Sequence, residues 1–138
     1  MAHEVIEDVD QSAIWVAFSG SIDDDEVMEL MEEVYQLDSF AEFDQFIDFS
    51  AVTAYTVTPS GIMNYNEVAR QRPERKAARE DRKLVVYAPD DHTFGMSRLW
   101  STRASNIGVN LEVFRCLNQA LDFIGLACSP IQNKKVPN

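Results

Sequence analysis

The sequence predicts an α/β domain in which a mostly parallel five-stranded sheet carries helices on its faces. Two segments, Ala13–Phe18 and Leu84–Ala88, are short and continuously apolar, which is typical of strands buried on both sides. Amphipathic helical segments alternate with the predicted strands, and this alternation indicates parallel strands joined by right-handed crossovers. The chain has 138 residues, enough for one domain. We expect residues 1–128 to form that domain and residues 129–138 to form a flexible polar tail.

An edge strand is expected at the start of the chain. Its apolar residues stand among carboxylates, which suits a short, solvent-facing strand: Val5, Ile6 and Val9. The short polar connection to Ala13–Phe18 implies an antiparallel hairpin. Ser19-Gly20-Ser21 is expected to end the second strand.

The clearest helix follows this strand. Asp23 stands three residues before Glu26, as in a capping box, and Asp24 and Asp25 would be stabilised by the positive end of the helix dipole. Apolar residues then recur at the spacing of one buried helical face: Val27, Leu30, Met31 and Val34.

A third strand and a second helix come next. Phe46–Phe49 is short and apolar enough for a buried strand, whereas Ser50–Val57 is expected to be a loop or an irregular extension. Thr58 is a good N-cap with Pro59 in the first turn. The helix should end or kink at Pro73, from which a second helical stretch is an open alternative.

The last elements complete the predicted order ββαβαβαβα. After the strand Leu84–Ala88, Asp90 and Asp91 are expected to cap a helix that Gly108 closes. Alternating apolar residues then predict a half-exposed strand: Val109, Leu111 and Val113. Asn118 is expected to open the final helix.

Charge is divided sharply between the two halves of the chain. Residues 1–69 contain sixteen Asp and Glu and no Lys or Arg, whereas residues 70–138 contain all twelve Lys and Arg and seven Asp and Glu. Because the net charge is −11, the chain repels phosphate, and we expect no nucleic-acid partner.

Basic residues recur at helical spacing after the second helix, and they would form one face if residues 73–83 were helical. These residues are Arg72, Arg75, Lys76, Arg79, Arg82 and Lys83. We expect this basic face to meet the acidic helix Asp23–Glu33, within one chain or between two copies. The alternative is a solvated face with pairs inside the helix.

The beginning of the chain lacks the basic segment and apolar stretch of a signal peptide. The longest apolar run, Ala13–Phe18, is six residues long and too short to cross a membrane. These features favour a cytoplasmic protein with no membrane-spanning segment. Cys116 and Cys128 are the two cysteines, which leaves two reduced thiols or one bridge as alternatives.

The element order and three local stretches resemble the STAS domain, the SpoIIAA-like fold of bacterial anti-sigma-factor antagonists. Asp48-Phe49-Ser50-Ala51-Val52-Thr53 is similar to the Asp-Leu-Ser-x-Val-x element that follows the central strand of that family. Val86–Asp91, with Phe94–Arg98, resembles a segment of STAS/Sec14-like bacterial proteins. Val113–Leu121 resembles their closing strand and helix. The resemblance covers residues 3–126 and implies the fold and a regulatory, protein-binding role.

Regulated members of this family carry a phosphorylatable serine in an Asp-Ser-Ser-Gly stretch at the start of the second helix. The matching stretch here is Thr58-Pro59-Ser60-Gly61, so the resemblance makes Ser60 a candidate phosphoacceptor. Thr58 replaces the aspartate and Pro59 replaces the first serine. A helix N-terminus also suits a phosphate on physical grounds. The alternative is that Ser60 only serves the helix start.

Three further groups are candidate ligand or interaction residues. Asp90, Asp91 and His92 follow a buried strand at the end where α/β folds bind ligands, and they would bind a metal, move a proton or only cap the helix. Asp48 and Ser50 end the central strand, although the lysine of a phospho-aspartate receiver is absent. Apolar residues after Asp91 would line a hydrophobic pocket or belong to the core: Phe94, Met96 and Trp100.

No glycine-rich nucleotide motif and no nucleophile elbow occurs, so we expect no cofactor and no metal. The sequence favours a non-enzymatic regulatory or protein-interaction module that forms a homodimer or binds a protein partner. A binder of a small hydrophobic or lipid-like ligand is the second hypothesis. A small enzyme that uses Asp90, Asp91 and His92 is the third.

Overall fold

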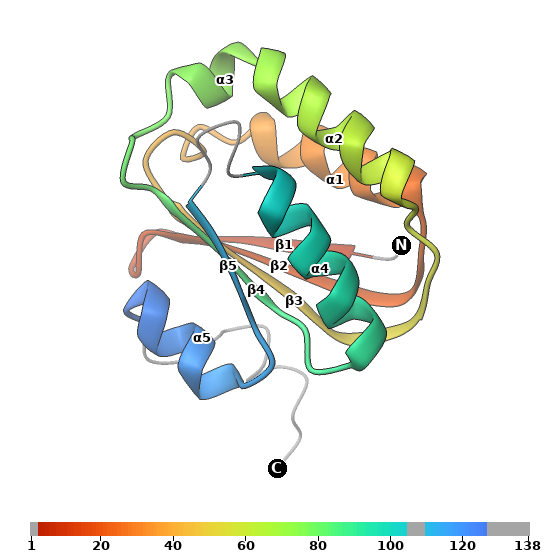
Figure 1. Cartoon of the computed structure of the whole chain (residues 1–138). Coiled ribbons are helices and arrows are strands. Elements are labelled where there is room, and N and C mark those ends of the chain that lie inside the picture. The colour runs from red at the N-terminus through yellow and green to blue at the C-terminus, as the bar shows by residue number, and fades with distance from the viewer. Residues whose placement is uncertain (1–2, 105–109, 127–138) are drawn as a thin grey trace.

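One five-stranded sheet organises the molecule, with strand order β1-β2-β3-β4-β5 (Figure 1). The computed structural model describes residues 3–104 and 110–126. Strands β1 and β2 pair antiparallel, and the other three pairs are parallel. The strands are β1 (His3–Asp8), β2 (Ala13–Ile22), β3 (Asp44–Tyr55), β4 (Lys83–Tyr87) and β5 (Asn110–Phe114). The predicted α/β class and the antiparallel edge strand are confirmed.

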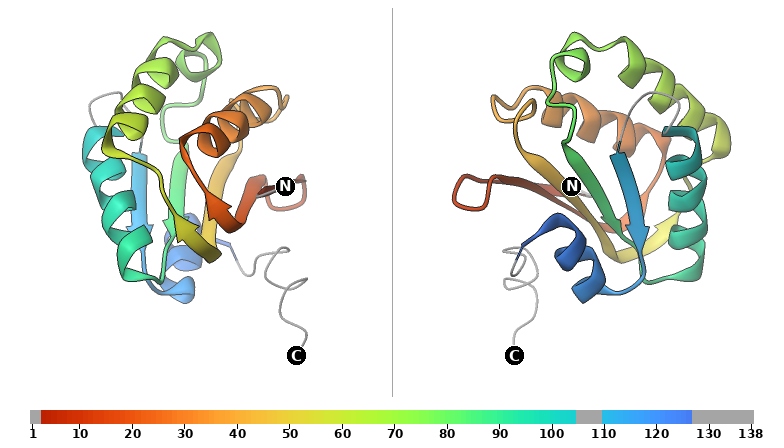
Figure 2. Two further views of the ribbon diagram at one scale, coloured as in Figure 1. Left: turned by 90° about the vertical axis from the view of Figure 1, so that its right-hand side faces the viewer. Right: turned by 60° about the vertical axis from the view of Figure 1, so that its left-hand side comes forward.

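Helices cover the two faces of the sheet unequally (Figure 2). Strands β2 to β5 lie in sequence order, so right-handed crossovers place every connecting helix on the same face. That face carries α1 (Asp24–Tyr35), α2 (Pro59–Gln71) and α4 (Asp91–Ala104), with the single turn α3 (Pro73–Lys76) after α2. Helix α5 (Leu117–Ile124) covers the opposite face.

Strand β2 separates two hydrophobic cores. Ile14, Val16 and Phe18 pack with α1, α2 and α4, whereas Trp15 and its neighbours pack with α5. All six residues from Ala13 to Phe18 are at most 2% exposed. The continuous apolar run thus reflects burial on both sides, as the sequence predicts.

Strand β2 is longer than the sequence indicates, because it continues through Ser19-Gly20-Ser21, where it was expected to end; that expectation is wrong. Of the two alternatives for Ser50–Val57, the irregular extension holds as far as Tyr55, which pairs with Ile22. Two register shifts and the positive φ of Gly20, 70°, let the pairing continue past the polar residues.

The predicted helix starts are confirmed by their caps. The Asp23 carboxylate accepts a hydrogen bond from the Glu26 amide at 3.0 Å, and Thr58 Oγ1 accepts one from the Gly61 amide at 2.9 Å. Helix α2 ends at Gln71, before Pro73, as expected, and the stretch from Pro73 is a single turn. The last helix begins at Leu117, one residue before the predicted start.

Several sequence predictions fall outside the described residues. They concern the helix end at Gly108, the strand residue Val109, the tail 129–138 and the alternatives for Cys128. Cys116 is exposed.

The burial of Leu111 and Val113 beside exposed neighbours confirms the alternation of β5.

A buried imidazole fastens β1 to α1. His3 donates from Nδ1 to Glu26 at 2.9 Å and from Nε2 to Glu33 at 2.8 Å, and its side chain is 3% exposed. Both nitrogens can donate only in the charged form, so the two carboxylates favour imidazolium. Burial alone would lower the pKa of His3, but the hydrogen bonds and charges of Glu33 and Glu26 outweigh it and raise the pKa above 6.5.

We expect the raised pKa of His3 to make stability depend on pH. The two bonds contribute fully below the unfolded-state pKa of 6.5, and their contribution is lost as the pH rises through the raised folded-state pKa. The difference in unfolding free energy between the protein and His3→Gln should shrink over this range by about 1–2 kcal/mol. Urea unfolding at a series of pH values measures it. A difference that stays constant with pH would contradict the assignment of a charged imidazole.

Candidate functional site

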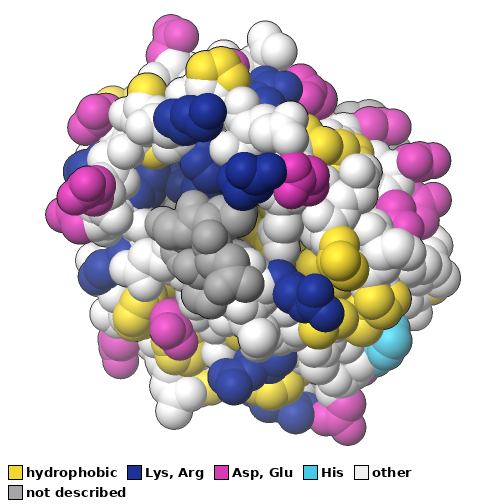
Figure 3. All heavy atoms as spheres, turned by 45° about the horizontal axis from the view of Figure 1, so that its top comes forward, with side chains coloured by type: hydrophobic (Ala, Val, Ile, Leu, Met, Phe, Trp, Pro, Cys, Tyr) yellow, Lys and Arg dark blue, Asp and Glu magenta, His cyan; other side chains and the backbone are white. Residues whose placement is uncertain are grey.

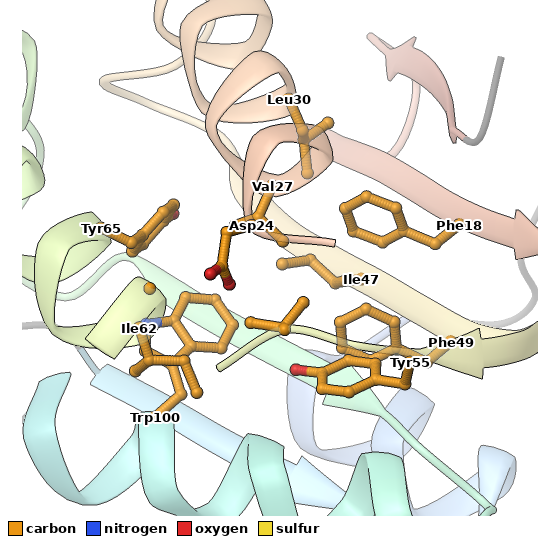
Figure 4. A pocket seen from close by; sticks show the side chains of 12 residues that line it. Phe18, Asp24, Val27, Leu30, Ile47, Phe49, Tyr55, Ile62, Tyr65 and Trp100 are labelled. Atoms are coloured by element: carbon orange, nitrogen blue, oxygen red, sulfur yellow. The ribbon is translucent and has the colours of Figure 1, made fainter. Parts of the chain in front are cut away.

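A small cavity lies where α1 and α2 begin, beside the carboxyl ends of β2 and β3 (Figure 4). Its volume is about 40 Å³. Its floor consists of buried apolar side chains, namely Phe18, Leu30, Ile47, Phe49, Val57 and Ile62. Its rim consists of partly exposed residues, namely Asp24, Val27, Tyr55, Gly61, Tyr65 and Trp100. Ligands of parallel α/β folds commonly bind at this end of the strands.

Aromatic rings form two groups around this cavity. Phe18 and Phe49 stack with centroids 5.2 Å apart, and Tyr55 meets Phe49 edge to face at 5.7 Å. On the other side, Tyr65 and Trp100 meet at right angles with centroids 5.4 Å apart. Figure 4 shows these rings on both sides of the Asp24 carboxylate, which points between them. The cavity therefore combines an aromatic lining with one charged group.

Asp24 ties the starts of two helices together. Its carboxylate accepts hydrogen bonds from the Thr58 amide at 2.9 Å and from Thr58 Oγ1 at 2.7 Å. Because the N-terminal ends of both α1 and α2 carry partial positive charge, a carboxylate between them is stabilised. Gly61 makes this approach feasible, since a Cβ at position 61 would lie 2.0 Å from Asp24 Oδ1.

Two tyrosines at the rim remain protonated over the physiological pH range. Burial, and then the charge of Asp24, raises the pKa of the Tyr55 hydroxyl. Burial likewise raises the pKa of the Tyr65 hydroxyl. Both hydroxyl groups are therefore neutral at physiological pH.

Ser60 lies beside this cavity but does not line it. It is the second residue of α2 and is exposed, as are Pro59 and Asn64. Met63, one turn along the same helix, is 52% exposed. The candidate phosphoacceptor therefore lies on an accessible surface that includes a large apolar side chain.

The acids and the imidazole after β4 do not converge on one point. Asp90 accepts hydrogen bonds from the amides of His92 at 3.0 Å and Thr93 at 3.2 Å, which is a helix-capping role. Asp91 pairs with Arg115. His92 donates from Nε2 to the Tyr55 carbonyl at 3.1 Å. Each group has a separate structural partner, so the geometry does not assemble the metal-binding or proton-transfer constellation considered from the sequence.

Asp48 and Ser50 are separated from the cavity by the sheet. Asp48 alternates with Ile47 and Phe49, which belong to the three-helix core, so its side chain lies on the α5 face. It is 2% exposed and accepts a hydrogen bond from the Ser50 amide at 2.7 Å. These residues therefore shape the local backbone of β3 and do not join the site at the start of α2.

Of the three apolar residues predicted to line a pocket, Trp100 lines this cavity, and Phe94 and Met96 do not. Phe94 and Met96 are partly buried against the three-helix core. The Arg115 guanidinium lies 5.1 Å from the centre of the Phe94 ring. Of these three residues, one therefore belongs to the cavity.

The predicted basic helical face does not exist, because only Pro73–Lys76 of that segment is helical. Within the chain, Arg72 reaches helix α1 through Glu32 at 2.6 Å, and Arg79 pairs with Asp44 at 2.7 Å. Lys83 donates to the Phe123 carbonyl on the opposite face. Lys76 is exposed. Figure 3 shows basic and acidic side chains interleaved over this part of the surface.

Three of these arginines surround a pair of aromatic rings. The guanidinium groups of Arg72, Arg75 and Arg82 lie 4.7, 6.0 and 4.2 Å from ring centres of Tyr35 or Phe40. Arg82 is 6% exposed and donates to the Phe43 carbonyl at 2.7 Å and to Gln45 Oε1 at 3.0 Å. Burial, and then the charge of Arg75, lowers the pKa of Arg82 to about 10.

We expect Arg82→Met to lower the free energy of unfolding by about 2–4 kcal/mol, because the half-buried Phe43 carbonyl and the buried Gln45 amide oxygen would lose their donor. Arg79→Met is the matched control and should cost about 0–1 kcal/mol, since Arg79 forms exposed ion pairs. Urea unfolding of both variants at neutral pH tests the difference. Equal losses would contradict a structural role for the buried guanidinium.

We expect Thr58→Ala to destabilise the protein by about 1–2 kcal/mol, because it removes the N-cap acceptor of Gly61 and a donor to Asp24. Thr58→Ser keeps the hydroxyl and should remain within about 0.5 kcal/mol of the parent. Denaturant unfolding measures both. If the two variants lose the same stability, the Thr58 methyl group rather than its hydrogen bonds matters.

Sequence reasoning missed most of this site. Asp24 was assigned only to the helix start, and Phe49 and Tyr55 were not considered as ligand-facing residues. The one local signal is Gly61 in the pattern Thr58-Pro59-Ser60-Gly61. A helix does not require glycine three residues after its N-cap, so a glycine there indicates that something lies close to the backbone. The approach of Asp24 explains that glycine.

The fold and the site define an α/β domain with a mixed sheet and a small apolar cavity bearing one carboxylate at its rim. Comparisons with protein-family models, curated proteins and solved structures found no match. Over residues 3–104 and 110–126, no helix has the length and apolar character needed to span a membrane. In the same residues, no three His, Cys, Asp or Glu side chains form a group that could hold a metal ion.

Proposed function

We propose that this chain is a STAS-like, SpoIIAA-like regulatory module that acts by binding a protein and not by catalysis. The observation that carries the proposal is the exposed first turns of α2, where Ser60 and Met63 lie together on the surface. The mixed five-stranded sheet and its helices agree with the fold that the resemblance implies. Methionine suits an interaction surface because its flexible side chain adapts to a partner.

Regulation by phosphate at Ser60 is part of this proposal. A phosphoryl group there would carry a charge of about −2 at the positive end of α2. Asp24 already interacts with the same helix end through Thr58, so the two anions would compete for it. Phosphorylation would therefore change both the charge of the α2 surface and the link between α1 and α2.

The proposed module is cytoplasmic, and its partner is either a second copy of the chain or another protein. Ion pairs within the chain occupy several of the basic groups, which include Arg72 and Arg79, so charge alone provides little of the contact with a partner. Apolar area around Met63 would supply most of the affinity, and the acidic α1 surface would guide association.

Binding of a small hydrophobic ligand is the second candidate function, and the cavity beside Asp24 supports it. At about 40 Å³ the cavity lacks room for a lipid tail, because pockets for drug-sized ligands occupy about 300–1,000 Å³. We therefore exclude a lipid tail inside the cavity and retain a ligand of which one small group enters it.

A photo-crosslinking amino acid at position 63, in cells of the source organism, tests the protein-binding proposal. We expect a crosslinked product at position 63 that Ser60→Asp reduces several-fold, because the new charge lies one turn away. The same crosslinker at Val9, which is 72% exposed on the distant hairpin, is the control. A product of twice the chain mass indicates a homodimer, and any other mass indicates a different partner. Equal crosslinking from both positions, or none, would exclude α2 as the docking surface.

A further inference from the structure

We propose that the cavity at the start of α1 and α2 binds a small organic cation whose nitrogen carries methyl groups. This inference rests on the second candidate function, ligand binding at that cavity, and names the chemistry of the ligand. Four properties of the site support it: its aromatic lining, its carboxylate, its hydrogen-bonding capacity and its size.

The aromatic lining favours a cation over a neutral apolar group. Five of the twelve lining residues are Phe, Tyr or Trp. The faces of such rings carry negative potential, and several rings around one space form the cage that recognises quaternary ammonium groups. Trp100, which gives the strongest interaction of this kind, lies at the rim together with Tyr55 and Tyr65.

The carboxylate at the rim supplies the countercharge. In the part of the chain that the structure describes, Asp24 forms hydrogen bonds with Thr58 but no ion pair with a Lys or Arg. Its neighbours in the first turn of α1 include Asp25 and Glu26, and the net charge of the chain is −11. A cation would therefore be attracted to the site and stabilised inside it.

The hydrogen-bonding capacity of the cavity favours a methylated ammonium over a primary one. Each of the Asp24 oxygens already accepts a hydrogen bond from Thr58, and most other lining side chains are apolar. A primary ammonium brings three donors, and some would lose their water partners without replacement. A methylated ammonium needs fewer acceptors and presents apolar methyl groups to the rings.

The size of the cavity limits what enters. A cavity of about 40 Å³ is small beside the roughly 300–1,000 Å³ of pockets for drug-sized ligands, so it admits one small group. That is the scale of a methylated ammonium head, with the rest of the ligand left outside the rim.

Nuclear magnetic resonance titration with tetramethylammonium chloride tests the proposal, with tert-butanol as a neutral probe of similar shape and sodium chloride as the salt control. The Trp100 indole N–H is the reporter, since Trp100 lines the cavity. The Trp15 indole N–H is an internal control because Trp15 lies in the α5 core on the opposite face. We expect tetramethylammonium to shift the Trp100 signal with a dissociation constant of about 1–10 mM and to leave Trp15 unchanged.

Asp24→Asn removes the charge with little change of shape and should weaken tetramethylammonium binding about tenfold. Asp25→Asn is the matched control, because it makes the same charge change at an exposed neighbour and should weaken binding less than twofold, within about 0.4 kcal/mol. Tyr55→Leu removes one ring and should also weaken binding, which keeps the test decisive if Asp24→Asn does not fold.

Four results would overturn the inference. If tert-butanol binds as well as the cation, the cavity is a ligand site that does not select charge, and only the inference fails. If neither probe shifts Trp100, the inference and the ligand-binding function both fail. If Asp24→Asn and Asp25→Asn weaken binding equally, the cation responds to the overall negative charge of the protein and does not contact Asp24. In a parallel titration with phosphatidylcholine vesicles, a shift of Trp100 by the vesicles and not by tetramethylammonium would replace the small cation with a lipid surface.

Discussion

The parallel pairing of β2 with β3 is the constraint on which the rest of the structure depends. These two strands are ten and twelve residues long, and they continue as a pair to Ile22 and Tyr55. The pairing of β3 with β4 ends earlier, at Asp48 and Tyr87. A two-stranded extension therefore projects beyond the rest of the sheet. It brings Phe49 and Tyr55 under the start of α2, and without it the cavity would have no wall on that side.

The same geometry explains how much could be predicted from the sequence. Features with local causes were predictable: continuous apolar runs gave the interior strands, Asp23 and Thr58 gave the helix starts, and Pro73 gave a helix end. The extension was predictable for β3 only as one of two alternatives and for β2 not at all, because polar and small residues such as Ser19 and Ala54 carry no strong strand signal. Their pairing follows from the register of the neighbouring strand and from the conformational freedom of Gly20.

The candidate site shows the same division between local and long-range information. Ser60 could be placed at an exposed helix start from its own neighbourhood. Asp24 could not be assigned to a cavity, since its contact with Thr58 joins residues thirty-four positions apart. The arginines were grouped by a helical spacing that the chain does not keep beyond Lys76. Instead, burial of Arg82 against Phe40 helps attach the basic half of the chain to the acidic half.

The sheet also separates two hydrophobic cores, one on each of its faces. Ile14 and Trp15 are adjacent along the backbone, yet they belong to separate hydrophobic layers. Packing on the α5 side can hold the strands in register while side chains on the other side vary. Substitutions that reshape the lining near Ile62 would therefore change the packing of the three-helix layer and leave the α5 layer as it is, so the two layers could vary independently.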